Sequence, residues 1–337
     1  MLKEKKFNSL SKKKQNRRAF SLVELAVVIV ILGVLIAGLV QSSRLIANMR
    51  LNVARDVTQS SAMPWINYIV TWYDSTAKDA FNESDTDDGD LISRWNGAEI
   101  RYSDRINLIQ SDSNKKPTYV SNGMFGLPSV KFDGTNDILE SETSNQDVLT
   151  YRSGTIFVVF EPKTVSSDNK KTIFYNPSSC DTELDFGMSF NNVKGAFGVA
   201  SAVSGEGCST TYATQSSGDF VIPNEKIVAS LIIYQTPTTQ GSTDNIKIYR
   251  NGNLWSSNQV NAQSFNSPAI NSSQKYSNGS NIFYVGAKKT GATERAFFDG
   301  LIGEMIVFNR SLNNEDRNEV ERYLGKKWGI KIKFLEQ

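Results

Sequence analysis

The sequence predicts a mainly β protein in which a long N-terminal α-helix precedes a large β-sandwich and a short C-terminal helix. All eight prolines lie at or after Pro64, and only two glycines precede Gly89. Residues 20–63 can therefore be helical throughout, because Gly and Pro are the residues that most disfavour a helix. From Trp65 onward, short apolar runs alternate with Gly, Asn, Ser and Asp, which is typical of strands joined by turns.

Residues 20–40 form an apolar segment that is long enough to cross a bilayer. They carry one charge, Glu24, and a membrane-spanning helix needs about 20 apolar residues. Residues 1–19 hold eight Lys/Arg and one acid, so we expect the N-terminus to stay cytoplasmic and the chain after Val40 to face outward. A carboxylate at the centre of a membrane helix costs about 2.5 to 3.5 kcal/mol unless it is paired. Glu24 therefore needs a partner.

Beyond residue 40 the expected helix becomes amphipathic. At 1.5 Å per residue, residues 20–63 would span about 66 Å, which is longer than a bilayer is thick. Apolar residues spaced by one, three or four positions lie between charged ones and share a helix face. We expect this apolar stripe to pack on the downstream domain. Its members are Leu45, Ile46, Met49, Val53 and Val57.

The net charge of +2 comes from the N-terminal segment. Residues 1–19 contribute +7, so the rest of the chain carries −5. No basic cluster follows residue 19, and we therefore expect no nucleic-acid partner. The chain contains no histidine, which excludes a His-based catalytic triad and a His-ligated metal site.

Several strands can be placed from local patterns. Residues 184–190 alternate between apolar and polar or small side chains, which predicts one buried and one solvated face. Residues 246–248 alternate likewise before Asn251-Gly252, a pair that favours a type I′ hairpin turn. Further candidate strands are 155–160, 171–175, 227–234, 282–285 and 304–308.

A helix is predicted after Asn313, which is a favourable N-cap residue. Glu315 and Asp316 would lie in its first turn, where acids complement the helix dipole. Apolar residues then share one face before Gly329. They are Val320, Tyr323, Leu324 and Trp328.

The segment from Arg17 to Glu24 resembles the type IV prepilin signal, and the resemblance extends to about residue 40. The family pattern is a basic leader, a small residue, Phe, Ser or Thr, Leu, any residue and Glu. A membrane peptidase cuts before the Phe and methylates the new amine. Ala19 and Phe20 match that junction, although Ala19 stands where the family most often has Gly. A plain signal anchor with a chance acid is the alternative.

This resemblance implies that residues 1–19 are a cleaved leader and that residues 20–63 are a pilin-like helix. It implies that Glu24 faces the N-terminal amine of a neighbouring subunit during assembly. The implied partners are a prepilin peptidase, other pilin-like subunits and the membrane. A place for the apolar stripe in a filament core is compatible with the pattern.

Two further segments, 127–134 and 298–312, resemble parts of the laminin-G-like, concanavalin A-like jelly-roll domains of bacterial surface proteins. Trp72-Tyr73-Asp74 and Trp95 fit the usual beginning of such domains. The likeness covers residues 65–333 and implies a jelly-roll head. The tryptophans expected in its core are Trp72, Trp95, Trp255 and Trp328.

The acidic loop 83–90 is a candidate metal site. Its oxygen ligands around Gly89 could hold Ca²⁺. The spacing does not match an EF-hand, since Gly89 falls one place short and Asn96 occupies the twelfth position. We prefer an acidic surface loop, keep calcium as the alternative and expect no other cofactor. The candidate ligands are Asp85, Asp87, Asp88 and Asp90.

Catalysis is poorly supported, and no catalytic residue is predicted. Glu183 and Asp185 resemble the start of the acidic motif of laminarinase-like glycosidases. Gly187 and Met188 stand where the third acid would be, so the acid/base residue is missing.

We therefore expect a non-enzymatic, prepilin-like surface subunit, a minor or tip component of a type IV pilus-like filament. Its head would bind a glycan or a protein for adhesion. It would reside in the bacterial cytoplasmic membrane with the head in the periplasm or outside, and on the cell surface when assembled. The alternatives are a pseudopilin of a type II-like secretion system and a membrane-anchored glycan-active enzyme.

Cys180 and Cys208, the two cysteines of the chain, are predicted to form a disulfide, because an even pair in an oxidising compartment usually does. Non-reducing peptide mapping should recover the linked pair. The bridge should stabilise the fold by roughly 3.5 kcal/mol in the chain-entropy model, so Cys180→Ser should cost a few kcal/mol at most. Free thiols in protein taken from its native compartment would support the alternative, two buried free cysteines.

Overall fold

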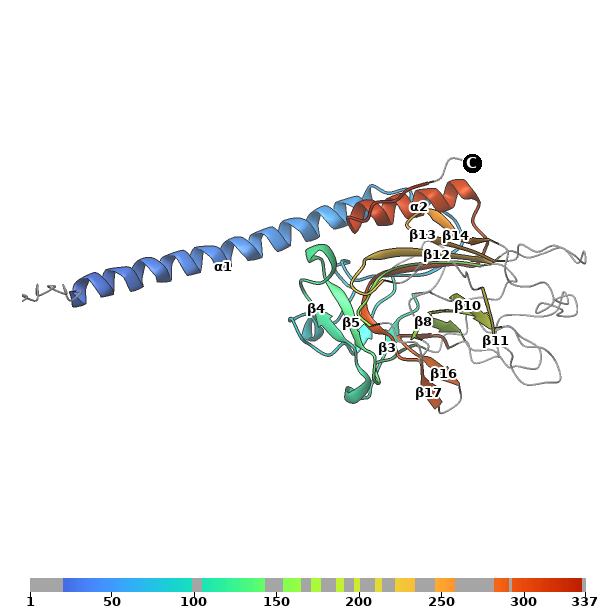
Figure 1. Cartoon of the computed structure of the whole chain (residues 1–337), viewed down its shortest axis with the longest axis horizontal. Coiled ribbons are helices and arrows are strands. Elements are labelled where there is room, and N and C mark those ends of the chain that lie inside the picture. Colours follow the sequence, from blue (N-terminus) through green and yellow to red (C-terminus); the bar gives the residue numbers. More distant parts are fainter. Residues whose placement is uncertain are drawn as a thin grey trace, which may run out of the picture. The chain divides into compact units, whose positions relative to one another are not determined.

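A computed structural model describes residues 21–98, 105–142, 154–164, 171–176, 186–190, 197–200, 210–213, 222–233, 246–257, 282–290 and 293–334. These residues form a long N-terminal helix, two large antiparallel sheets and a short C-terminal helix (Figure 1). The predicted fold class is confirmed. The chain divides into two units, Met1–Asn48 and Met49–Gln337, so the last turns of the long helix belong to the second unit.

The long helix, α1, spans Leu22–Gln59 and ends four residues before the predicted boundary at residue 63. The side chain of Ser61 competes with the helix, because its Oγ donates to the carbonyl of Thr58 at 2.7 Å and accepts from the N–H of Met63 at 3.3 Å. Pro64 follows, and it has no N–H to continue the hydrogen bonds of an α-helix. A short 3₁₀ turn, Met63–Trp65, then leads into the sandwich.

The first half of α1 is apolar on all sides. Its large apolar side chains between Leu22 and Leu39 are 48% to 85% exposed, and one 18-residue window of the helix has a mean hydropathy of 3.0. By length and composition the segment can cross a membrane, which fits the predicted anchor.

The larger sheet has eight strands and runs through the middle of the sandwich fold. Strand β18 lies at its centre and pairs with β7 along one edge. Along the other edge, the first residues of β18 pair with β5 and its later residues pair with β1. The remaining strands extend the sheet on both sides. In spatial order the strands are β14 (Asn253–Ser257), β13 (Ile246–Arg250), β12 (Ile227–Ile233), β7 (Gly154–Pro162), β18 (Asp299–Phe308), β5 (Ser129–Asp133) and β4 (Thr118–Val120), with β1 (Ile69–Asp74) beside β18.

The smaller sheet has six antiparallel strands and packs against the larger one. In spatial order they are β2 (Arg94–Trp95), β3 (Leu108–Ile109), β6 (Leu139–Ser141), β15 (Tyr284–Val285), β8 (Lys171–Asn176) and β9 (Phe186–Phe190). Two separate hairpins complete the described strands. They are β10 (Phe197–Ala200) with β11 (Thr210–Ala213), and β16 (Lys288–Thr290) with β17 (Thr293–Arg295).

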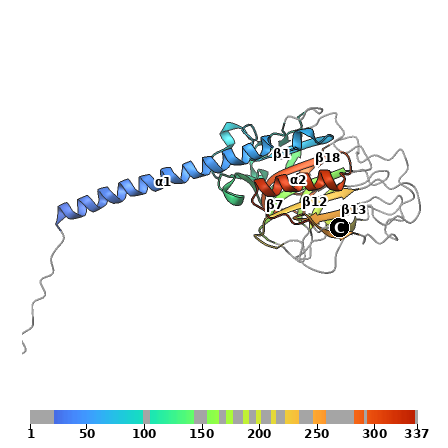
Figure 2. The ribbon, with the colours of Figure 1, turned by 90° about the horizontal axis from the view of Figure 1, so that it is seen from above.

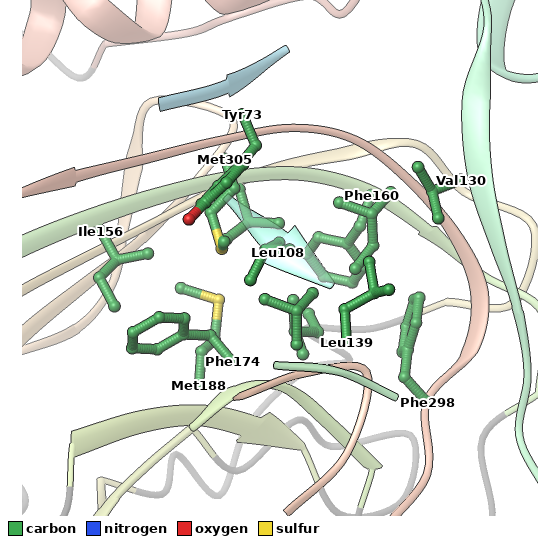
Figure 3. Packing of buried hydrophobic residues seen from close by; sticks show 14 of the residues in the cluster. Tyr73, Leu108, Val130, Leu139, Ile156, Phe160, Phe174, Met188, Phe298 and Met305 are labelled. Atoms are coloured by element: carbon green, nitrogen blue, oxygen red, sulfur yellow. The ribbon is translucent and has the colours of Figure 1, made fainter. Parts of the chain in front are cut away.

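The main hydrophobic core lies between the two sheets. Figure 3 shows side chains of the larger sheet, such as Ile156 and Met305, facing Leu108, Phe174 and Met188 of the smaller sheet. These five residues are fully buried. The two layers thus share one close-packed interior, as in other β-sandwiches.

A second core covers the outer face of the larger sheet. Helix α2, Asn314–Lys327, lies over strands β7 and β12 (Figure 2). The last turns of α1 contribute Ala54, which is 2% exposed. Members of this second core are Ala54, Phe157, Val159, Val228, Ile306, Phe308, Leu312, Val320, Leu324 and Trp328.

Local sequence signals for turns and caps are confirmed. Asn251 and Gly252 have φ values of +50° and +88°, as a type I′ turn requires, and they join β13 to β14. The side chain of Asn313 accepts from the N–H of Asp316 at 2.8 Å and caps α2. Gly329 follows α2 with φ +61°.

Several strand boundaries differ from prediction, among them β7, which extends the predicted 155–160 to Gly154–Pro162. The strand predicted over 282–285 shrinks to Tyr284–Val285, because the N–H of Phe283 donates to the side chain of Ser141 at 3.0 Å. The strand predicted over 304–308 extends back to Asp299, because residues 299–302 pair with β5.

The predicted packing of the apolar stripe on the head is wrong for Met49 and Val53. Both residues belong to the second unit, and they are 59% and 60% exposed. Among the five, Val57 does pack against the second core. The buried side of these turns is instead centred on Ala54, which is rotated by about 100° from Val53.

Candidate functional site

The start of α1 is a capping box. The Ser21 hydroxyl accepts from the N–H of Val23 at 3.3 Å, and Glu24 Oε2 accepts from the N–H of Ser21 at 2.8 Å. The pattern Ser-x-x-Glu satisfies two backbone donors that a helix start leaves unpaired. The negative charge also lies in the first turn, where the helix dipole favours it. The spacing Ser21-Leu22-Val23-Glu24 carries this signal, which the expectation of a buried acid at Glu24 did not include.

This arrangement gives Glu24 a partner within its own helix. A carboxylate has two oxygens, and the capping box uses Oε2. The other oxygen keeps its capacity to accept from a second donor. Ala19 and Phe20, the predicted processing residues, lie outside the described residues.

The last turns of α1 are fixed to the head by polar contacts as well as by Ala54. Arg55 Nε donates to the carbonyl of Thr76 at 2.7 Å, and the hydroxyl groups of Thr58 and Tyr323 lie 3.1 Å apart. One helical turn earlier, Arg50 contacts Gly126, whose φ of +75° is of the kind that glycine adopts easily.

Next to these contacts between α1 and the head lies a buried ion cluster. We call it the Glu304 cluster and define it as Glu304, Lys327 and Asp74. Lys327 Nζ is 2.8 Å from Glu304 Oε2 and 2.6 Å from Asp74 Oδ2, and the side chains of Lys327 and Glu304 have no exposed surface. The three residues come from β18, α2 and β1. One ammonium group therefore connects two strands and a helix in the interior.

Four donors converge on Glu304. Its Oε1 accepts from Trp72 Nε1 at 2.7 Å and from the Tyr323 hydroxyl at 2.6 Å, and its Oε2 accepts from Trp328 Nε1 at 2.8 Å and from Lys327. An indole N–H can only donate, and an ionised carboxylate offers about four acceptor positions. The ionised form of Glu304 therefore satisfies every donor around it.

Burial and charge act against each other in this cluster. Burial raises the pKa of Glu304, and the positive charge of Lys327 opposes that rise. Burial, together with the charge of Glu304, raises the pKa of Tyr323, so the phenol stays protonated and donates. Since Tyr323 also meets Thr58, the cluster extends to α1.

The acidic loop is held by its own hydrogen bonds. Asp85 Oδ2 accepts from the N–H of Ser93 at 2.9 Å, and Asp88 Oδ1 accepts from the N–H and the hydroxyl of Ser121, both at 2.8 Å. Burial opposes ionisation of Asp85, but the hydrogen bonds from Ser93, Ser84 and Asn82 together outweigh it and lower the pKa of Asp85. The backbone bond from Ser121 lowers the pKa of Asp88.

The candidate calcium ligands are thus directed at different partners. Asp90 Oδ2 accepts from the N–H of Asp87 at 2.7 Å. Within the described ranges, no group of three or more acidic, Cys or His side chains is placed to hold a metal ion. The geometry of the loop gives the calcium hypothesis no support. Cys180, Cys208, Glu183 and Asp185 lie outside the described residues, so the disulfide and the acidic pair stay predictions.

Comparison with protein families identifies the start of the chain. A family model for the prokaryotic N-terminal methylation motif matches residues 14–40. The chain carries this methylation motif. It spans the predicted junction, the capping box and the first half of α1. A search of curated proteins finds no match.

Solved structures similar to this chain include three β-rich proteins. Domain 4 of an extracellular arabinanase from Geobacillus stearothermophilus, in complex with arabinotriose, is 12% identical with a TM-score of 0.44, covering 76% of this chain and 98% of that one. The botulinum neurotoxin serotype D ligand binding domain, in complex with N-acetylneuraminic acid, is 13% identical with a TM-score of 0.44, covering 78% and 52%. A Trypanosoma rangeli sialidase is 11% identical with a TM-score of 0.41, covering 76% and 32%. Likeness at this level carries no conclusion about function.

Removing the ammonium group of Lys327 should destabilise the head strongly. Lys327→Met leaves Glu304 and Asp74 buried without their cation, which we expect to lower the free energy of unfolding by about 3 to 5 kcal/mol. Urea unfolding of the full chain in detergent, followed by tryptophan fluorescence, measures the change. Lys326→Met is the matched control, because Lys326 is the exposed neighbour on α2 and should cost at most about 0.5 kcal/mol. Equal losses in the two variants would contradict the cluster's role.

Proposed function

We propose that this chain is a pilin-like subunit, a minor or tip component of a type IV pilus-like filament, which displays a β-sandwich head for binding. The observation that carries the proposal is the methylation motif at residues 14–40. It lies at the start of an apolar helix whose last turns, from Met49, are built into a folded head.

The apolar composition of α1 supports its insertion in a membrane before assembly. Residues 22–39 expose large apolar side chains along their length, and these side chains are stable in hydrocarbon. The capping box lets Glu24 enter that environment with one oxygen already bonded. After cleavage before Phe20, the other oxygen could accept from the N-terminal amine of a neighbouring subunit.

The exposed part of the apolar stripe supports contact with other subunits. Met49 and Val53 face away from the head's own core and are more than half exposed. Burying such side chains is favourable by roughly 25 cal/mol per Å² of apolar surface. Helices of neighbouring pilin-like subunits would supply that cover in a filament.

The size of the head supports a minor or tip position. The second unit, Met49–Gln337, is far larger than the helix that would carry it. Close packing of helices in a filament leaves little lateral room for large heads. A position that occurs once or rarely in the filament therefore suits this chain. In this proposal the head lies in the periplasm or outside the cell before assembly and on the cell surface afterwards.

A binding role is proposed in preference to an enzymatic one. The chain has no histidine, and the pair Glu183 and Asp185 is followed by Gly187 and Met188 where a third acid would be needed. The absence of histidine excludes a His-based triad, and the segment that resembles a glycosidase motif lacks its acid/base residue.

Replacing Glu24 should separate processing from assembly. Glu24→Gln keeps a capping-box side chain, because Gln serves at this position as Glu does, and loses the charge. We expect intact-mass analysis to find a mature chain that begins with N-methylated Phe20 in both wild type and variant. We expect at least tenfold less of the variant in sheared filaments, measured by immunoblot against the membrane fraction.

Ser21→Ala is the control for the helix cap, since it removes the cap at a cost of about 1 kcal/mol and keeps the charge. It should assemble far better than Glu24→Gln. A mature protein that retains Lys3 to Ala19, or normal assembly of Glu24→Gln, would contradict the proposal. Recovery of the wild type in membranes and medium but never in filaments would favour the secretion-system alternative.

A further inference from the structure

Two aromatic side chains are exposed in the connection between α1 and β1. Trp65 is 75% exposed and Tyr68 is 61% exposed. Three other tryptophans, Trp72, Trp95 and Trp328, are at most 9% exposed, as expected for a sandwich of this size. Large aromatic side chains gain more from burial than most residues, so their exposure at this connection suggests that a ligand covers them.

The backbone holds Tyr68 in an unusual conformation. Its φ is +75°, which costs about 1 to 3 kcal/mol for a residue other than glycine. Bonds from the end of β18 hold it there. The carbonyl of Tyr68 accepts from the N–H of Asn309 at 3.1 Å, and the carbonyl of Asn67 accepts from Arg310 Nε at 3.4 Å. The ring of Tyr68 therefore projects from a backbone that is anchored on both sides, and such strain is typical of functional sites.

Arg310 also supports the ring of Tyr68. Its guanidinium carbon lies 5.5 Å from the ring centroid, and its NH2 group lies 2.6 Å from Asp316 Oδ2 in the first turn of α2. A guanidinium group over an aromatic face is a favourable cation–π contact. Because Asp316 balances the charge of Arg310, this pair adds no net charge beside Tyr68.

The spacing and the neighbours of the two rings fit a carbohydrate. Trp65 and Tyr68 are three positions apart in the sequence, so their Cα atoms are at most about 11 Å apart, within reach of adjacent units of one oligosaccharide. The ring faces carry partial negative charge, which attracts the C–H groups on the apolar face of a sugar. Asn67 and Arg310 supply amide and guanidinium groups that hydrogen-bond to hydroxyl groups.

A protein partner fits less well. Protein interfaces usually centre on a contiguous apolar patch with a polar rim. Apart from Met49 and Val53 on α1, the other large apolar side chains that are exposed in the described part of the second unit lie on different elements. They are Leu91, Phe125, Ile222 and Leu254.

We propose that Trp65, Tyr68 and Arg310 form a binding site for a neutral oligosaccharide of at least two units. The site gives a ligand class to the binding head, and it rests on the proposed function. Trp65 and Tyr68 stack against sugar rings, while Arg310 orients Tyr68 and bonds to a hydroxyl group. The balanced pair of Arg310 and Asp316 gives no preference for an acidic sugar.

The test is binding of defined glycans to the full-length chain in detergent. An array of neutral and sialylated oligosaccharides identifies the ligand, and calorimetry then uses the best neutral probe, with cellotetraose and chitotetraose as the first two. We expect saturable binding to at least one neutral oligosaccharide and at least tenfold weaker binding by Trp65→Ala and Tyr68→Ala. Tyr68→Phe keeps the ring and should bind within about twofold of the wild type.

Leu254→Ala is the matched control, because Leu254 is an exposed apolar residue on β14 and should leave binding unchanged. Melting temperatures of all variants show whether they are folded. If Tyr68→Ala is unfolded, the glycan affinity of Trp65→Ala tests the site. Binding of no neutral glycan, a preference for sialylated glycans, or unchanged binding by Trp65→Ala would overturn the site.

Filament assays separate this inference from the proposed function. A wild-type chain that assembles into filaments but binds no neutral glycan would overturn the site and leave the filament role standing. A chain that binds a neutral glycan through Trp65 but never enters filaments would contradict the filament role and leave the binding site standing. Loss of assembly with unchanged glycan binding in Trp65→Ala would show that this surface contacts a neighbouring subunit, which also overturns the site.

Discussion

The buried carboxylate of Glu304 is the constraint on which the rest of the head depends. Trp72, Tyr323, Trp328 and Lys327 all donate to it, and they come from β1, α2 and the residue that follows α2. A buried charge is stable only when its surroundings are complete. Helix α2 must therefore lie on the larger sheet in one register, with Lys327 between two acids.

The same cluster explains how the long helix joins the head. Thr58 meets the hydroxyl of Tyr323, and Arg55 donates to the carbonyl of Thr76, whose own N–H and hydroxyl donate to Asp74. The contacts that α1 makes here are polar or small, apart from Val57. Its larger apolar side chains, Met49 and Val53, are left exposed. The helix thus holds its own head with some of its side chains and leaves Met49 and Val53 exposed.

Much of the fold follows from local patterns, because local physics sets those features. The positive φ values at Asn251-Gly252 and the cap at Asn313 depend on neighbours in sequence, and so does the early end of α1 at Ser61 and Pro64. The capping box was equally local and could have been found from the spacing of Ser21 and Glu24.

Other features depend on contacts between distant residues and could not be predicted. Trp72 and Glu304 are 232 residues apart in sequence, and no pattern near either residue indicates the bond. The apolar stripe was misleading because hydrophobic periodicity shows which face avoids water, and it does not say whether the cover is the same chain or another. The acidic loop was ambiguous for a similar reason, since Ser93 and Ser121 determine where the carboxylates of Asp85 and Asp88 point.

The central claim is that one helix contacts its own head through some side chains and other subunits through the side chains that the head leaves exposed. Val53 and Val57 test it directly, because they are the same residue type four positions apart, and Val57 packs on the second core while Val53 is 60% exposed. A diazirine amino acid of about leucine size would replace each valine in turn, and assembled filaments would be irradiated and analysed by mass spectrometry. The account predicts cross-links between chains from position 53 and within the chain from position 57. Cross-links from position 53 to its own head alone, in filaments that contain the protein, would contradict it.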